Sequence, residues 1–166
     1  MATDAPPAPV DQAPCRQRPP GRDISAAVDA HLSRFVADQS DALRDLDAGL
    51  EPLAAAAAAA VLDGGKRLRP TFAHWGWRGV AGPDAPLPPV LPALAALEVL
   101  HAFALVHDDV MDASAQRRGR PSTHRAFTDL HRARGLRGDA GRFGESAAVL
   151  VGDLLLVWAD QLIAAA

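Results

Sequence analysis

The chain has 166 residues, of which 49% are hydrophobic and 22% charged, and its net charge is −3. This length suits one domain, or a part of one, that can bury a substantial core. The slightly acidic balance gives no electrostatic reason to expect a nucleic-acid partner, so we expect none. The single cysteine, Cys15, excludes an intramolecular disulfide and a cysteine-rich zinc site.

Residues 1–22 are rich in proline and alanine and show no periodicity, which predicts a disordered tail. They contain no apolar core of the kind found in signal peptides, so we expect a cytoplasmic protein. The most apolar stretches are 53–62, which is short, and 147–159, which Asp153 interrupts. Because neither reaches the roughly 18–20 residues of a membrane-spanning helix, we expect no membrane span.

From Ile24 onward the pattern is helical. Apolar residues recur at three- and four-residue spacings as far as Leu50, which predicts a first helix. The segment 53–62 is nearly all alanine, the best helix former, and Pro52 fits its first turn. Gly64 follows Asp63 and ends this second helix.

The remaining segments alternate between helices and loops. We expect a third helix from Pro70, a proline-rich loop over 81–92, and a long helix over 93–112 that lacks internal glycine and proline. A basic loop at 113–121, a short helix at 122–134, a glycine-containing loop at 135–144 and a last helix at 145–166 complete the pattern. No period-two series indicates β-strands, so the predicted fold class of residues 23–166 is all-α.

Three carboxylates gather at the end of the long predicted helix. Asp112 follows Asp108 by four residues and Asp109 by three, so it lies about one helical turn beyond both. Like charges repel, and a helix C-terminus disfavours anions, so this arrangement is more readily accepted when a cation is bound. Oxygen ligands with open coordination positions favour Mg²⁺ shared with substrate phosphates. A solvated acidic helix end is the alternative.

A polar stripe leads along this helix to the carboxylates. On a helical wheel it shares one narrow sector with Leu105, in the register expected to face the core. Polar groups on such a face indicate a water-filled or ligand-filled cavity within a helical bundle. The polar members of the stripe are Glu98, His101, Asp108 and Asp112.

Two basic segments flank the carboxylates in sequence. In Gly64-Gly65-Lys66-Arg67-Leu68-Arg69-Pro70, the cations Lys66 and Arg69 stand at a predicted helix start, where they could grip a phosphate. The segment Gln116–Pro121 contains Arg117 and Arg118, which a short loop could fold back over the aspartates. The first segment could instead be an ordinary basic surface loop. A nucleic-acid role is a weak alternative for the second, because the neighbouring carboxylates would repel a phosphate backbone.

Taken in order, the motifs GGKRLRP, ExxHxxxLxHDDxxD, RRGRPSTH and FGESAAVLVGDLLL resemble the trans-isoprenyl diphosphate synthases, or polyprenyl synthetases. The likeness covers about residues 25–166 and is closest to bacterial geranylgeranyl diphosphate synthases. It implies the N-terminal part of the isoprenoid synthase helical bundle. It also implies a prenyltransferase that condenses isopentenyl diphosphate with an allylic prenyl diphosphate, with Mg²⁺ as cofactor, and a homodimer.

The resemblance assigns roles to matching positions. It implies that Asp108, Asp109 and Asp112 hold Mg²⁺ and that Arg117 contacts the allylic diphosphate. The residues implied for the isopentenyl diphosphate site are Lys66, Arg69, His101 and Arg118. Phe103 and Ala104 match positions that set product length in the family, although core packing is an alternative for Phe103, because our wheel turns it off the stripe.

The sequence departs from the family in one respect, since no second aspartate-rich motif follows Asp112. We therefore expect residues 23–166 to be a partial, N-terminal domain with little or no synthase activity alone. A non-catalytic subunit that pairs with a full-length synthase is an alternative. A metal phosphohydrolase built on His107 and Asp108 is a further one, which would leave the paired arginines unexplained. Gly152 and Asp153 match a family position where packing or capping is expected rather than metal binding.

Overall fold

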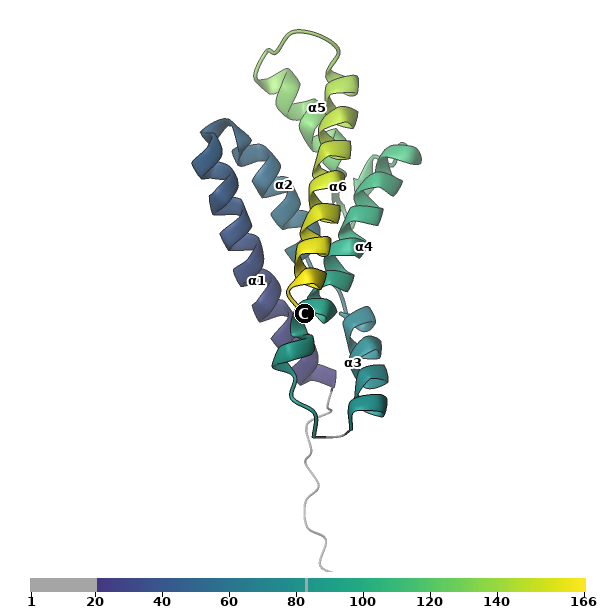
Figure 1. Cartoon of the computed structure of the whole chain (residues 1–166). Coiled ribbons are helices and arrows are strands. Elements are labelled where there is room, and N and C mark those ends of the chain that lie inside the picture. Colours follow the sequence, from purple (N-terminus) through teal and green to yellow (C-terminus); the bar gives the residue numbers. More distant parts are fainter. Residues whose placement is uncertain (1–20, 83) are drawn as a thin grey trace, which may run out of the picture.

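The computed structural model of the chain describes residues 21–82 and 84–166 (Figure 1). The predicted tail lies outside the described residues except for its last two, which already belong to the first helix. In chain order the elements are α1 (Gly21–Leu46), the 3₁₀ turn η1 (Ala48–Leu50), α2 (Glu51–Leu62), α3 (Leu68–Ala81), the 3₁₀ turn η2 (Pro88–Val90), α4 (Leu91–Met111), β1 (Gln116–Arg117), β2 (Arg120–Pro121), α5 (Thr123–Ala133) and α6 (Ala140–Ala164). The prediction of an all-α fold is confirmed.

The helices form a bundle around α4 and α6, which share the most extensive helix contact in the described part of the chain. In Figure 1, α1 and α2 form an antiparallel pair on one side of α6, while α4 lies on the other. Helix α5 packs on α6 at one end of the bundle, and α3 contacts α4 and α1 at the other. The segment that joins α4 to α5 carries the short β1–β2 hairpin.

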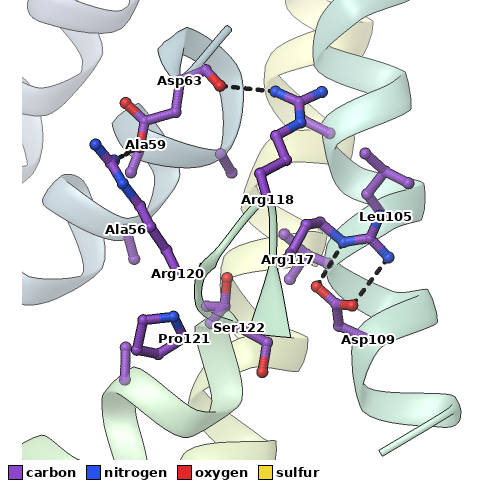
Figure 2. A pocket seen from close by; sticks show the side chains of 15 residues that line it. Ala56, Ala59, Asp63, Leu105, Asp109, Arg117, Arg118, Arg120, Pro121 and Ser122 are labelled. Carbon is purple, nitrogen blue, oxygen red and sulfur yellow. Dashed lines mark hydrogen bonds and ion pairs between the residues drawn. The ribbon is translucent and has the colours of Figure 1, made fainter. Parts of the chain in front are cut away.

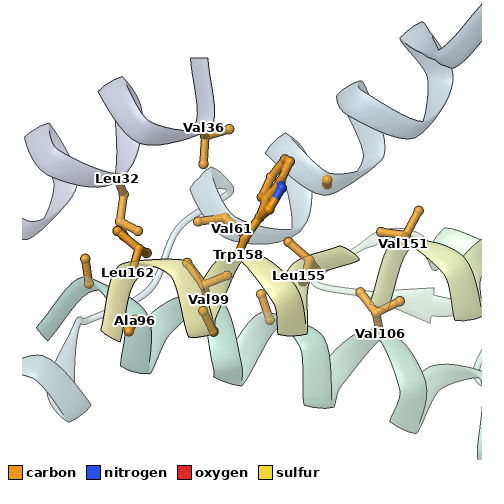
Figure 3. Packing of buried hydrophobic residues seen from close by; sticks show 14 of the residues in the cluster. Leu32, Val36, Val61, Ala96, Val99, Val106, Val151, Leu155, Trp158 and Leu162 are labelled. Carbon is orange, nitrogen blue, oxygen red and sulfur yellow. The ribbon is translucent and has the colours of Figure 1, made fainter. Parts of the chain in front are cut away.

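One hydrophobic core holds α1, α2, α4 and α6 together (Figure 3). Its largest fully buried side chain is Trp158 of α6, which meets Phe35 of α1 edge to face with ring centroids 6.0 Å apart. Around it lie apolar side chains from all four helices, because each helix turns one apolar stripe inward. Representative members are Leu32, Val36, Val61, Val99, Val106, Val151 and Leu155.

The first helix ends earlier than its apolar rhythm predicts. Helix α1 stops at Leu46, and the side chain of Asp47 accepts a hydrogen bond of 2.6 Å from the backbone N–H of Gly49. This cap opens a 3₁₀ turn, and Leu50 therefore belongs to the turn and not to the helix. The second helix, with Pro52 in its first turn, is confirmed.

The predicted loop at 135–144 is wrong in its second half, because α6 already begins at Ala140. The side chain of Asp139 caps this start by accepting a 2.6 Å hydrogen bond from the backbone N–H of Arg142. Gly144 lies inside the helix for a tertiary reason. A Cβ atom there would stand 2.2 Å from the hydroxyl of Thr128, so glycine allows α5 and α6 to pack closely.

Two helical segments, Pro88–Met111 and Ala140–Ala164, are long and apolar enough to cross a membrane by length and composition alone. The expectation that no stretch meets this criterion is therefore wrong. That expectation considered only uninterrupted apolar runs, whereas a membrane-spanning helix tolerates a few polar residues. The core helix of a globular protein passes the same test, and these two segments pack against each other in the core.

Candidate functional site

The site is organised by the hairpin between α4 and α5, which sequence analysis predicted only as a loop. Strands β1 and β2 pair Arg117 with Arg120, and the two residues between them, Arg118 and Gly119, have φ angles of 53° and 77°. Two consecutive positive φ angles are typical of the type I′ turn that joins short antiparallel strands. The hairpin holds its three arginines in fixed positions between α2 and α4.

Arg117 reaches α4 and binds two of the predicted metal ligands. Its Nε and Nη2 atoms donate hydrogen bonds of 2.7 and 2.9 Å to the two carboxylate oxygens of Asp109, and Nη2 lies 3.1 Å from Oδ2 of Asp108. The Asp109 hydrogen bonds raise the pKa of Arg117. Asp109 is 2% exposed, whereas the side chain of Asp108 is 54% exposed. The prediction that the arginines fold back over the aspartates is therefore confirmed for Arg117. It is wrong for Arg118, whose guanidinium binds backbone carbonyls at the end of α2.

Arg118 and Arg120 point the other way, to the end of α2 (Figure 2). Arg118 donates to the backbone carbonyl of Asp63 at 2.7 Å and to that of Gly64, and Arg120 forms an ion pair with the Asp63 carboxylate. Cations are favourable at a helix C-terminus, where carbonyl groups lack partners within the helix. The hairpin thus connects the end of α2 with the end of α4.

A residue that sequence analysis passed over, Arg67, anchors the basic segment before α3. It is 6% exposed and has a left-handed backbone, with φ 48°. Its guanidinium donates to Glu98 of α4 at 2.9 Å, to Asp29 of α1 at 2.7 Å and to the carbonyl of Val61 in α2 at 3.3 Å. Burial lowers the pKa of Arg67, but the hydrogen bonds to Glu98 and Asp29 outweigh this and raise it. One side chain therefore ties together α1, α2, α4 and the start of α3.

The position of Glu98 in the sequence could have predicted that Arg67 is buried. Glu98 is also 6% exposed, and a carboxylate in a buried register needs a cation. Its Oε2 atom is bound to Arg67, while Oε1 has no hydrogen-bond partner among the described residues.

His101 lies where the two basic segments meet. It shares a small hollow with Glu98 and Arg118. Desolvation and the positive charge of Arg69 lower its pKa, and Arg118 and Arg117 add to this effect, while Glu98 opposes it. Of the predicted diphosphate-binding residues, His101 and Arg118 therefore line the same hollow, whereas Arg69 acts on the imidazole through its charge. Lys66 is exposed beside Arg67.

The polar stripe on α4 does not face the core as predicted. The buried face runs through Ala95, Val99, Ala102 and Val106 and ends at Asp109. Along the predicted stripe, exposure instead increases from the buried Glu98 to the exposed Asp108 and Asp112. Asp109 is therefore the buried carboxylate, and Asp112 stands past the helix end as its C-cap.

The two residues matched to chain-length control lie away from the arginines. Phe103 is half-buried and meets His107 with ring centroids 4.8 Å apart, and Ala104 is exposed. His107 turns toward α6, where Nε2 lies 3.2 Å from the carbonyl oxygen of Val149. A Cβ on Gly152 would stand 2.2 Å from this ring, so the expected packing role of Gly152 is confirmed. The chain-length role of Phe103 and Ala104 stays a prediction.

A pocket of about 530 Å³ opens between α2, α4, α5 and the hairpin (Figure 2). Its walls are mainly apolar, and charged side chains stand where the hairpin crosses it. The residues that line it are Ala56, Ala59, Ala60, Asp63, Ala102, Leu105, Val106, Asp109, Arg117, Arg118, Arg120, Pro121, Ser122, Thr123 and Ala126. Such a pocket suits a ligand with an apolar body and a polar head.

No group of three or more His, Cys, Asp or Glu side chains in residues 21–82 and 84–166 is placed to hold a metal ion. This finding covers the predicted trio Asp108, Asp109 and Asp112 as well as a phosphohydrolase site on His107, whose ring turns to α6. The pair Asp108 and Asp109 fits Mg²⁺ by its oxygen chemistry. Its two carboxylates share one cation in this structure, the guanidinium of Arg117.

The chain is similar to prenyl diphosphate synthases over most of its length. It is 34% identical over 139 residues to a farnesyl diphosphate synthase of Geobacillus stearothermophilus, covering 82% of this chain and 38% of that protein. It is 36% identical over 100 residues to a geranylgeranyl diphosphate synthase of Methanosarcina mazei, covering 60% of this chain and 25% of that protein. The chain thus spans well under half the length of these relatives.

A solved structure shares the fold. It is the crystal structure of a geranylgeranyl pyrophosphate synthase from Corynebacterium glutamicum, complexed with isoprenyl diphosphate and magnesium. It matches with a TM-score of 0.78 and 38% sequence identity, covering 86% of this chain and 41% of that one. The family model described as polyprenyl synthetase matches residues 51–166. The chain belongs to the polyprenyl synthetase family.

Proposed function

We propose that this chain forms the part of a prenyl diphosphate synthase site that binds Mg²⁺ and diphosphate. The reaction class is the condensation of isopentenyl diphosphate with an allylic prenyl diphosphate, with geranylgeranyl diphosphate as the expected kind of product. The observation that carries the proposal is the hairpin, whose arginines contact both the aspartates of α4 and the end of α2. The three arginines of this element, together with Asp63 and Asp109, line one largely apolar pocket.

Each side chain has a role that its position supports. Asp108 and Asp109 would hold Mg²⁺, joined by Asp112 from just past the helix end. Arg117 would contact the allylic diphosphate from the same position in which it now binds the aspartates. The second diphosphate would be bound by Lys66, Arg69, His101 and Arg118.

The charges explain how such a site favours the reaction. Bound Mg²⁺ would neutralise the diphosphate as it leaves the allylic carbon. The guanidinium groups, fixed by the hairpin, are oriented before the reaction and need no reorganisation to stabilise that charge. The apolar walls contributed by α2 and α4 would exclude water from the carbocation.

Calorimetry with inorganic pyrophosphate tests the binding half of this proposal. Pyrophosphate should bind the chain in the presence of Mg²⁺, and Asp108→Ala should weaken this binding about tenfold or more, because an exposed metal ligand is lost. Asp129→Ala removes an exposed aspartate of α5 far along the chain and should have no effect. Equal affinity in the two variants would remove the metal role of Asp108. Assayed with both prenyl substrates and Mg²⁺, the chain alone should form little or no longer product.

A partner-subunit role is a second candidate, supported by the surface of α6. Leu150, Val157 and Ile163 are 60%, 54% and 56% exposed, a high exposure for large apolar side chains. One relative, 35% identical over 108 residues, is named as the large subunit of a heterodimeric geranylgeranyl pyrophosphate synthase of Arabidopsis thaliana. Light scattering coupled to size exclusion would distinguish a monomer from a homodimer or a pair with a full-length synthase.

A further inference from the structure

The buried carboxylate of Glu98 has one oxygen with a partner and one without. Oε2 accepts a hydrogen bond of 2.9 Å from Arg67, whereas the buried Oε1 has no partner among the described residues. A carboxylate oxygen that is buried without a hydrogen bond costs free energy, since it has lost its hydration. Where no protein group serves such an oxygen, an ordered water is its usual partner.

Glu98 lines a small hollow between the end of α2, helix α4 and the hairpin. The volume of this hollow is about 10 Å³, which is room for one water molecule and for nothing larger. Three other side chains with hydrogen-bonding groups line it, namely those of Arg67, His101 and Arg118. A water in a protein interior typically makes about three hydrogen bonds, and these side chains can supply them.

The charges around the hollow favour a neutral occupant. The guanidinium groups of Arg67 and Arg118 disfavour a cation, and the carboxylate of Glu98 disfavours an anion. Water can donate a hydrogen bond to Oε1 and accept one from a guanidinium at the same time. Water is therefore the occupant that this lining fits.

His101 lines the same hollow but is held by fewer contacts than its neighbour Arg118. The guanidinium of Arg118 donates to the backbone carbonyls of Asp63 and Gly64. Burial and through-space charges shift the pKa of His101, and no hydrogen bond among the described residues contributes to this shift. His101 follows Glu98 by three residues on α4, so the two side chains are neighbours on the helix surface. A water between them would hold the ring in one orientation.

We propose that one water molecule occupies this hollow and joins Oε1 of Glu98 to the imidazole of His101. Glu98 is then a positioning residue. Arg67 fixes one oxygen of its carboxylate, and the other oxygen holds, through the water, the ring that would contact the second diphosphate. The role of His101 rests on the proposed function, whereas the water site depends only on the hollow and its lining.

A high-resolution crystal structure of the 166-residue chain tests the water site without any substitution. We expect an ordered water about 2.5–3.2 Å from Oε1 of Glu98 and at a similar distance from one ring nitrogen of His101. An empty hollow, or an Oε1 atom bonded directly to a protein group, would overturn the inference.

Calorimetry with inorganic pyrophosphate and Mg²⁺ tests the positioning role. Glu98→Gln keeps the shape of the side chain but turns an amide nitrogen into the hollow, because the amide oxygen must accept from Arg67. The matched control is Asp29→Asn, which changes the other carboxylate bound to Arg67 and does not line the hollow. Circular dichroism confirms that each variant is folded.

Charge and positioning predict opposite results for Glu98→Gln. Both variants remove one negative charge, which by itself strengthens the binding of an anion. We expect Glu98→Gln instead to weaken pyrophosphate binding by about three- to tenfold, the effect of one lost hydrogen bond, and Asp29→Asn not to weaken it. In a chain that already carries His101→Gln, the further change Glu98→Gln should alter the affinity little, because Glu98 acts through that ring.

The positioning role is wrong if Glu98→Gln binds pyrophosphate as tightly as Asp29→Asn does. It is also wrong if Glu98→Gln has the same effect with and without His101. If the unsubstituted chain fails to bind pyrophosphate with Mg²⁺, the proposed function fails and the positioning role with it, whereas the crystal structure still decides the water site.

Discussion

Replacing Arg67 with methionine would test whether one buried ion pair holds the basic segment against the rest of the bundle. Methionine keeps an unbranched side chain of similar reach but removes the charge and all four hydrogen bonds to Asp29, Val61 and Glu98. The positive φ angle at position 67 costs arginine and methionine the same, so the substitution isolates the contribution of the side chain.

The size of the effect follows from burial. Arg67 and Glu98 are each 6% exposed, so the substitution leaves Glu98 as an unpaired buried charge. Removing one partner of such a pair costs about 3–5 kcal/mol. Asp29 is 53% exposed and adds little, since exposed pairs contribute about 0–1 kcal/mol. For a chain of this size the loss corresponds to a fall in Tm of about 6–20 °C.

Equilibrium unfolding in urea, followed by circular dichroism, measures this loss. The double variant Arg67→Met with Glu98→Met should recover most of the free energy of unfolding, because no unpaired charge remains. A single variant that loses less than about 1 kcal/mol, or a double variant that recovers nothing, would refute the reasoning.

Three further predictions concern packing, pH and the hairpin. Gly144→Ala places a Cβ 2.2 Å from the hydroxyl of Thr128 and should lower the free energy of unfolding by about 1–3 kcal/mol. The control Gly79→Ala has open space around it and should not lower this free energy. Equal urea midpoints for the two variants would contradict the prediction. Desolvation and nearby arginines lower the pKa of His101, and a bound anion should raise it. Affinity for pyrophosphate should therefore rise as the pH falls toward this lowered pKa. Calorimetry across pH should find this rise reduced in His101→Gln, and an unchanged profile would count against the histidine. Arg117→Gln frees the carboxylates of Asp108 and Asp109. The variant should therefore bind Mg²⁺ alone more tightly and pyrophosphate more weakly. A change of the same sign in both affinities would contradict this prediction.

Local signals predicted much of the fold. The alanine run before Gly64 predicted α2, and the absence of glycine and proline after Pro92 predicted α4, because both rules concern neighbours in sequence. The early start of α6 was missed, because Gly144 is required by contact with α5 and not by a turn. Sequence rules that treat glycine as a helix breaker cannot detect such a contact.

The sequence predicted the contacts of Arg117 with the aspartates but not the register of α4. The aspartates and arginines were identified because clustered like charges need counterions. The wheel placed Asp108 toward the core, whereas the buried face runs through Val99, Ala102 and Val106 to Asp109. Arg67 was overlooked, since its partners come from three other helices and depend on tertiary packing.

A crystal structure of the chain grown with Mn²⁺ and pyrophosphate would test the central claim most directly, because the anomalous signal of manganese locates the metal. Manganese should lie at the carboxylates of Asp108 and Asp109, with Arg117 in contact with the pyrophosphate. Manganese remote from both carboxylates, or pyrophosphate bound without contact to the hairpin arginines, would contradict it.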